Sequence, residues 1–123
     1  MKIVVTHSSA FDFKKKLYEP LRNSALNSAH EIFLPHEDDN SENGSKEKIQ
    51  NADVVLAEVS LPSTGQGIEL GWANTFGKPI VCLHEKGSTP SSALRFVTNT
   101  FIEYESESDM LQKLESALSS LQR

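Results

Sequence analysis

The sequence predicts an α/β protein with a doubly wound, flavodoxin-like sheet of five parallel strands. Apolar segments of strand length alternate along the chain with segments of helical periodicity. Residues 54–59 are almost continuously apolar, which is typical of a parallel strand buried on both faces. At 123 residues the chain suits one hydrophobic core, so we expect a single domain over residues 1–123. The expected strand order is 2-1-3-4-5, with right-handed crossovers and helices on both faces.

The first strand is expected over residues 3–5, and a polar loop that opens a helix follows it. The polar residues of this loop are His7, Ser8, Ser9 and Asp12. The helix runs to about Asn27, because apolar residues recur in it at a spacing of four. Pro20 should kink or restart this helix, because proline lacks a backbone N–H.

The second strand is expected over residues 32–34, and the segment 35–45 that follows is polar and acidic. Such a segment cannot pack a core, so we expect a loop there. A short helix over residues 45–51 then leads back to the sheet.

The central part of the chain, residues 53–83, reads as strand, loop, helix and strand. The loop contains Pro62, Ser63, Gly65 and Gly67, and a glycine-bearing loop that runs into a helix offers N–H groups and a hydroxyl to an anion. The helix is expected from about Gly67 to Gly77, with Pro79 just beyond its end. The fourth strand is expected over residues 80–83.

Glu69 is the unusual residue of this helix. Its neighbours at helical spacing are apolar or small, namely Trp72, Ala73 and Phe76. In the first turn of a helix, the dipole and free N–H groups would stabilise an ionised carboxylate despite partial burial. A first-turn glutamate in ordinary solvent is the alternative, and the spacing leaves both interpretations open.

The last part of the chain provides a short helix that begins at Ser91 or Ser92 and runs through Val97. The fifth strand is expected over residues 101–104. Ser106 and Asp109 resemble a capping box at the start of an amphipathic C-terminal helix. The apolar positions of that helix are Met110, Leu111, Leu114, Leu118 and Leu121.

Composition excludes several classes of partner. The chain has 12 basic and 17 acidic residues, and its net charge of −5 argues against a nucleic-acid or anionic-membrane surface. No segment approaches the ~20 apolar residues of a membrane span, and the N-terminus has no leader pattern. The single cysteine, Cys82, is expected in a buried strand and cannot form an intrachain disulfide. We therefore expect a cytoplasmic protein that needs no cofactor.

In such a sheet, ligands bind where the carboxyl ends of the first and third strands diverge. That crevice would join the loop 7–9 to the loop 60–67, and Glu69 would line it. Glu58 shares a strand face with Leu56 and Ser60 near the crevice, so we expect it to support the site from behind. Asp53, at the other end of the third strand, is expected to be structural.

Histidines raise the alternative of a metal site. His7, His36 and His84 each follow a predicted strand and could gather with Glu58, Glu69 or Glu85. Their spacing matches no compact metal motif, so we expect none.

The central part of the chain contains three characteristic strings, ADVVLAEVS, PSTGQGIELGWA and GKPIVCL. Together they resemble the nucleoside 2-deoxyribosyltransferase family, closest to its 2′-deoxynucleoside 5′-phosphate N-hydrolase branch. The resemblance implies that Glu69, in the ELG triplet, is the nucleophile. It implies that Ser63 and Gly65 hold a 5′-phosphate. It also implies that Ser92, in SSALR, reaches the phosphate of a neighbouring subunit, and hence that the protein is a homodimer.

The chain departs from the family pattern at two places. Its first loop, THSSAFDF, has no glycine or arginine, so that only Ser8 and Ser9 could replace the usual substrate contacts. The position of the family's acid is occupied by Ser45. Three other residues are candidates for that acid, and the sequence does not choose among them: Glu42, Glu47 and His7.

The implied function is an N-glycosidase or deoxyribosyltransferase for a 2′-deoxynucleoside or its 5′-monophosphate, acting through a covalent glycosyl-Glu intermediate. The alternative is a nucleotide-binding module of the same fold without efficient turnover, which the serine at position 45 favours. A metal-dependent hydrolase that uses the histidines is a third possibility.

Overall fold

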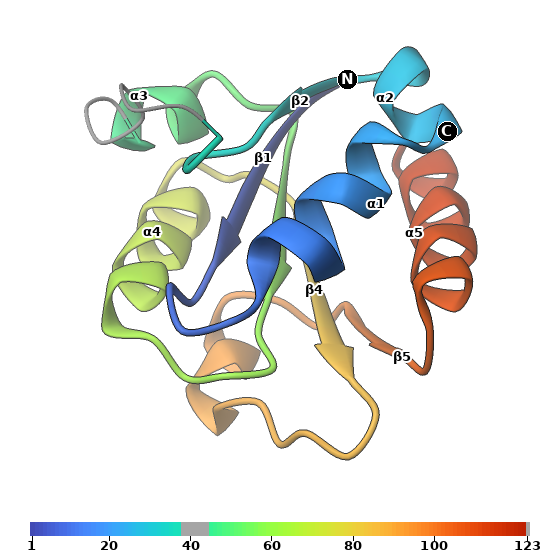
Figure 1. The fold of residues 1–123 in the computed structure, drawn as a ribbon. Coiled ribbons are helices and arrows are strands. Elements are labelled where there is room, and N and C mark those ends of the chain that lie inside the picture. Colours follow the sequence, from blue (N-terminus) through green and yellow to red (C-terminus); the bar gives the residue numbers. More distant parts are fainter. Residues whose placement is uncertain (38–44, 123) are drawn as a thin grey trace.

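The computed structural model describes residues 1–37 and 45–122. All strand pairs of its sheet are parallel and their order is β2-β1-β3-β4-β5, which confirms the predicted fold class and strand order (Figure 1). The strands are β1 (Lys2–His7), β2 (Glu31–Phe33), β3 (Val54–Glu58), β4 (Ile80–Glu85) and β5 (Phe101–Tyr104). Most of the expected loop 35–45, including Glu42, lies outside the described residues.

Helices cover both faces of the sheet. Figure 1 shows α3 (Ser45–Gln50) and α4 (Thr64–Thr75) on one side. The other side carries η1 (Lys14–Tyr18), α1 (Glu19–Arg22), α2 (Ala25–Ala29) and α5 (Glu107–Leu121). The short helix η2 (Ser92–Phe96), drawn in orange, lies below α4 near the tip of β4.

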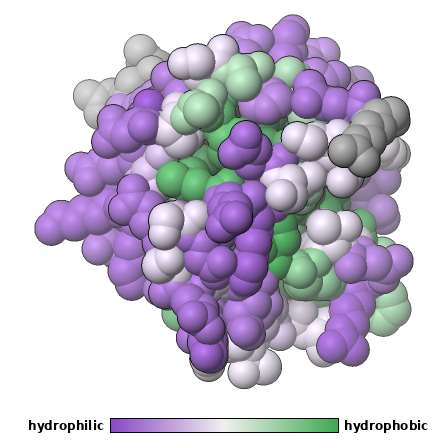
Figure 2. Space-filling view, turned by 90° about the vertical axis from the view of Figure 1, so that its right-hand side faces the viewer, coloured by the Kyte–Doolittle hydropathy of each residue, from purple (hydrophilic) through white to green (hydrophobic). Residues whose placement is uncertain are grey.

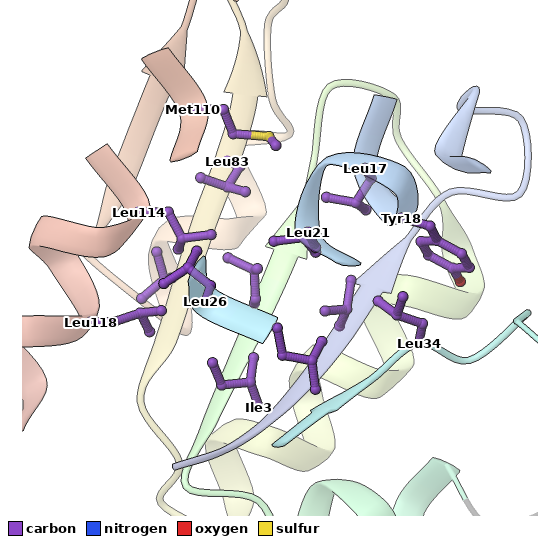
Figure 3. Close-up of a cluster of buried hydrophobic side chains, with 14 of the residues drawn as sticks. Ile3, Leu17, Tyr18, Leu21, Leu26, Leu34, Leu83, Met110, Leu114 and Leu118 are labelled. Carbon is purple, nitrogen blue, oxygen red and sulfur yellow. The ribbon is translucent and has the colours of Figure 1, made fainter. Parts of the chain in front are cut away.

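The central strands send alternate residues into two separate cores. In β3, Val54 and Leu56 pack with the core under α1 and α5. Figure 3 shows other side chains of this core, among them Leu21, Leu83 and Leu114. Val55 and Ala57 pack with the core under α4. This alternation explains the continuous apolar run, because both faces of β3 are covered. Cys82 lies in the second core, and burial raises the pKa of its thiol to about 12.

The first helix differs from the expectation. It consists of a π-helical turn, η1, then α1 with Pro20 near its start, then a break and a new helix, α2. Glu19 donates its N–H to the carbonyl of Lys14, five residues back, and the α-helical pattern begins there. Ser24 is the N-cap of α2, because its side chain accepts the Leu26 N–H. The main break in the expected helix therefore lies after Pro20, at Ser24.

The start of α4 was predicted three residues too late. Ser63 is the N-cap and accepts the Gln66 N–H, so the helix begins at Thr64 and includes both Gly65 and Gly67. Glu69 therefore lies in the second turn, and the expectation that the first turn stabilises its carboxylate is wrong. The end of α4 agrees with the prediction, with Gly77 at a φ of 70°.

Helix α5 begins as predicted. Ser106 accepts the Asp109 N–H, and Asp109 accepts the Glu105 N–H at 3.0 Å. Met110, Leu114 and Leu118 are buried against the sheet. Figure 2 views this side of the molecule, which is mostly hydrophilic with hydrophobic surface visible between the polar side chains. Within residues 1–37 and 45–122, no helix has the length and apolar character to cross a bilayer.

Candidate active site

Buried polar side chains gather at the carboxyl ends of β1 and β3, where the sequence predicted a crevice. His7 pairs with Glu58 in the register of these two strands. Strand β1 continues to His7, which therefore lies in the sheet and not in the loop where it was expected. The buried polar residues are Thr6, His7, Ser8, Glu58, Ser60 and Gln66. Buried groups of this kind are stable only when hydrogen-bonded, and their partners define the site.

Glu58 is 1% exposed, and two protein donors satisfy its carboxylate. Its Oε1 accepts the Ser60 N–H at 2.6 Å, and its Oε2 accepts the Tyr104 hydroxyl. Burial raises the pKa of Glu58, and both burial and the bond to Glu58 raise that of Tyr104. Ser60 in turn accepts the Glu85 N–H at 2.8 Å. Glu58 thereby ties the end of β3 to the ends of β4 and β5.

Gln66 fixes the first turn of α4 to the same strand ends. Its Nε2 donates to Thr6 Oγ1 at 3.1 Å and to the carbonyl of Glu58 at 2.9 Å. The side chain is 4% exposed. Sequence reasoning missed this residue, because a glutamine between two glycines was interpreted as part of a loop.

His7 is held in one tautomer. Its Nδ1 lies 2.9 Å from the carbonyl of Ser8, which can only accept, so Nδ1 carries the proton. Burial lowers the pKa of His7, and its Nε2 accepts the Tyr18 hydroxyl at 2.7 Å. Tyr18 also accepts the His36 N–H at 3.0 Å, and Phe13 stacks on the His7 ring at 4.3 Å. His7 in this state has no free proton to give to a leaving base.

Glu69 lies beside this aromatic cluster. Burial raises the pKa of Glu69 to about 7, and the carboxylate accepts no hydrogen bond from the described residues. The pKa of Tyr18 is raised to about 12, mainly by burial, and the charge of Glu69 contributes. Ala73 is buried, and Trp72 and Phe76 are half-buried. Glu69 is therefore a half-buried acid. This agrees with the interpretation of a partly buried carboxylate and not with that of a glutamate in ordinary solvent.

The loop before α4 keeps the groups that an anion needs. Ser63 Oγ accepts the Gln66 N–H at 3.4 Å, which leaves its own hydroxyl proton free to donate. Within the described part of the chain, the N–H groups of Thr64 and Gly65 have no acceptor. The space beside the Cα of Gly65 is open, since a Cβ added there would meet no atom within 4 Å. Ser63 and Gln66 also line a mainly apolar cavity of about 330 Å³ between this loop and η2.

The other predicted residues either stabilise the fold or are exposed on the surface. Ser8 is buried and caps its own loop by accepting the Ala10 N–H at 3.1 Å, whereas Ser9 is exposed. Ser92 is exposed on η2. Asp53 accepts the Lys2 N–H at 2.7 Å, at the opposite end of β3 from the crevice.

The acid that would protonate the leaving base is not identified. Ser45 and Glu47 lie in the first turn of α3, where Glu47 is exposed. The histidine-based alternative finds no cluster either. Among residues 1–37 and 45–122, no three His, Cys, Asp or Glu side chains stand together as metal ligands would.

No family model matches the sequence. Over 49 residues the chain is 51% identical to the 5-hydroxymethyl-dUMP N-hydrolase of Rattus norvegicus, and the match covers 38% of this chain and 30% of the rat protein. It is 38% identical over 73 residues to a putative 2′-deoxynucleoside 5′-phosphate N-hydrolase of Syntrophotalea carbinolica, covering 57% of this chain and 51% of that protein. The matched part of the chain thus spans about half or less of the length of these relatives.

Two solved structures share the fold. The CMP N-glycosidase BcmB of Clostridium botulinum superposes with a TM-score of 0.70 at 28% identity, over 94% of this chain and 99% of that one. A 2-deoxyribosyltransferase of Bacillus psychrosaccharolyticus superposes with a TM-score of 0.63 at 22% identity, over 89% and 90% of the two chains.

Proposed function

We propose that this chain, whose resemblance to the nucleoside 2-deoxyribosyltransferase family the comparisons confirm, is an N-glycosidase for a nucleoside 5′-monophosphate. One observation carries the proposal: Glu69 is a half-buried carboxylate with no hydrogen bond from the described residues, four residues after Gly65 on the same helix. That spacing is about 6 Å along the helix axis. A carboxylate at this place suits attack on a sugar whose phosphate is bound at the helix start.

The reaction has two steps. The ionised carboxylate of Glu69 forms a bond to C1′ while the C1′–N bond breaks, and the base leaves with the bonding electrons and takes up a proton. Water, or another base in a transferase, then attacks C1′ and releases Glu69. Thr64, Gly65 and Ser63 would donate to the phosphate, at the positive end of α4. The substrate's remote phosphate would thus orient the sugar for attack.

The names of the relatives support a substrate class. 5-Hydroxymethyl-dUMP and CMP, which appear in the names of two of them, are both pyrimidine nucleoside 5′-monophosphates. They differ in the sugar, so deoxyribose and ribose forms are both candidates. We expect a pyrimidine 5′-monophosphate to be cleaved faster than the matching nucleoside. Ser63, Thr64 and Gly65, which we call the anion loop, would bind only the phosphate of the former.

The decisive experiment incubates the protein with a panel of nucleosides and their 5′-monophosphates, in deoxyribose and ribose forms, and measures released base by chromatography. The Glu69→Ala variant is the control for a contaminating activity. A 2-fluorinated deoxyribosyl analogue should add the mass of the sugar at Glu69. Base release by Glu69→Ala at the parental rate would contradict the proposal.

The homodimer is part of the same proposal. Phe96 on η2 is 87% exposed, and the apolar cavity beside η2 is lined by Leu61, Pro62 and Leu94. A second copy could cover both features and bring Ser92 to the neighbouring phosphate.

Mixing Glu69→Ala with Ser92→Ala subunits tests the dimer. A mixed pair carries one site with both lesions and one with neither, so activity should partly return. A monomer by light scattering, or no recovery after confirmed subunit exchange, would contradict it.

A binding module without turnover is the second candidate, and two observations favour it. Ser45 occupies the position at which the resemblance expects an acid, and His7 has no free proton. In that case a nucleotide would raise the melting temperature by several degrees and no base would be released.

A further inference from the structure

A second hollow lies next to η2, and neither Glu58 nor Glu69 lines it. It has a volume of about 430 Å³ and lies between the end of β4 and the start of β5. Ser91 lines both this hollow and the apolar cavity that contains Ser63. Helix η2 therefore stands at the boundary between the anion loop and the hollow. The residues that line the hollow are His84, Ser88, Thr89, Pro90, Ser91, Ser92, Arg95 and Phe101.

Ser92 and Arg95 present their side chains on the same face of η2. This helix is of the 3₁₀ type, in which residues three apart eclipse each other. Both residues line the hollow, and both are exposed. A hydroxyl and a guanidinium on one face form a pair of donors that matches the oxygens of a phosphate group.

The guanidinium of Arg95 has no competing partner among residues 1–37 and 45–122, where it takes part in no ion pair or hydrogen bond. Arg22 is the contrast, since it donates to Glu37, Asn27 and the carbonyl of Ile32. The acid that follows His84, Glu85, is paired with Lys16 at 3.3 Å. Arg95 thus stands as an uncommitted cation in a chain whose net charge is −5.

His84 has fewer groups free to bind a ligand than Arg95 has. Ser88 donates its hydroxyl proton to the carbonyl of Glu85 at 2.6 Å, so its oxygen accepts from His84 Nδ1 at 3.3 Å. This arrangement leaves only Nε2 of His84 for a ligand. Ser91 is similar, because its Oγ accepts the Ala93 N–H at 3.4 Å and only its hydroxyl proton is free.

We infer that Arg95, together with Ser92, binds the phosphate group of the nucleotide and supplies the positive charge that the first loop lacks. The loop THSSAFDF contains no arginine, and the start of α4 contributes N–H groups and hydroxyls but no cation. The ligand class is a phosphate monoester dianion. The inference rests on the proposed function and its homodimer, because it assigns Arg95 to the phosphate in the neighbouring subunit's site, the same phosphate that Ser92 would contact.

The test compares Arg95→Gln with Lys86→Gln, which removes the same charge from an exposed side chain that pairs with Glu105. Calorimetry measures the affinity of each variant for dUMP, CMP, their nucleosides and inorganic phosphate. Arg95→Gln should weaken nucleotide binding by about 10- to 100-fold and leave nucleoside binding unchanged. Lys86→Gln should change either affinity by less than about twofold. Arg95→Lys should lie between Arg95→Gln and the parent, because it keeps the charge and loses the fork.

Failure of this inference can be told from failure of the proposed function. Nucleotide binding that depends on Arg95 without any base release would remove the glycosidase activity and keep the phosphate site. Base release from nucleotides with the same affinity and KM in Arg95→Gln and Lys86→Gln would keep the activity and overturn the inference. Arg95-dependent binding of inorganic phosphate without binding of any nucleotide would also overturn it.

Discussion

The end of β3 and the second turn of α4 each hold a buried or half-buried acid, and the two are built in opposite ways. Glu58 accepts hydrogen bonds from Ser60 and Tyr104 and is almost completely enclosed. Glu69 accepts none from the described residues, although burial raises the pKa of both carboxyl groups. Burial alone therefore does not distinguish a structural acid from a reactive one.

The hydrogen-bond donors around each carboxylate distinguish the two acids. The two donors to the oxygens of Glu58 stabilise the fold, and the almost complete burial of this side chain keeps a substrate from its carboxylate. The carboxylate of Glu69 has lost water without gaining such donors, which costs stability and keeps its oxygens available to a substrate. The contrast assigns the first acid to the architecture of the crevice and supports the proposal that the second takes part in the reaction.

The largest expected effect is on turnover and tests the role of Glu69. Glu69→Gln keeps the shape of the side chain and removes the nucleophile, so base release should fall by at least about 10³-fold while nucleotide affinity changes little. Single-turnover kinetics and calorimetry measure the two quantities. Glu107→Gln, in the exposed first turn of α5, is the matched control. A loss of affinity equal to the loss of rate would show that Glu69 only binds.

The next largest effect is on stability and tests the role of Glu58. Glu58→Ala leaves the Tyr104 hydroxyl and the Ser60 N–H unpaired in the interior, so the free energy of unfolding should fall by about 3 kcal/mol. Urea denaturation measures this change, with the exposed Glu115→Ala as the control. If Glu58→Ala unfolds at the same urea concentration as the parent and loses only activity, the structural role of Glu58 is contradicted.

Gln66 lies between the two regions, and its replacement should affect both. Gln66→Leu removes the donor shared by Thr6 and the Glu58 carbonyl, which should cost about 2 kcal/mol of stability. Base release should fall by about tenfold, because α4 and Glu69 lose their anchor to the strand ends. Gln112→Leu, on the exposed side of α5, should change neither quantity. A full loss of stability with unchanged turnover of the folded fraction would separate Gln66 from the site.

The smallest effect concerns pH and sharpens the contrast. The pKa of Glu69 is raised to about 7, so the folded protein holds a proton there that the unfolded chain has lost above pH ~4.5. The parent should therefore lose stability relative to Glu69→Gln as pH rises from about 4.5 to 7. Full linkage would give about 3 kcal/mol, and because the side chain is only half-buried and partly screened by solvent we expect about 1 kcal/mol. Melting curves at pH 5 and pH 8 measure it. Equal melting temperatures of parent and variant at both pH values would contradict the raised pKa.

Local patterns predicted much of the fold. Strand β5 has the predicted bounds, and Ser106 caps α5 as its spacing to Asp109 indicated. These features depend on residues close together in the sequence. The start of α4 failed for a local reason as well, because Gly65 and Gly67 are typical of loops and the cap at Ser63 outweighed them.

The candidate site was predicted less completely. Glu69 and Ser63 could be found from their strings of neighbours, but the contacts that hold the crevice together join distant residues. Gln66 and Thr6 are 60 positions apart, and Tyr104 and Glu58 are 46 apart. No periodicity encodes such pairs. A carboxylate buried on a strand needs a hydrogen-bond partner, and only the fold identifies that partner as Tyr104.

The bond between Glu58 and Tyr104 also sets an order of events during synthesis. Tyr104 leaves the ribosome 46 residues after Glu58, a delay of about 2–9 s at about 5–20 residues per second. Strand β1 must likewise wait for Val54–Glu58 before it acquires its inner neighbour. Until Phe101–Tyr104 emerges, a nascent chain can pair β1, β2, β3 and β4, but the Glu58 carboxylate lacks the Tyr104 hydroxyl that it accepts in the folded protein. The hydrogen-bond network around Glu58 is therefore complete only after β5 has been made.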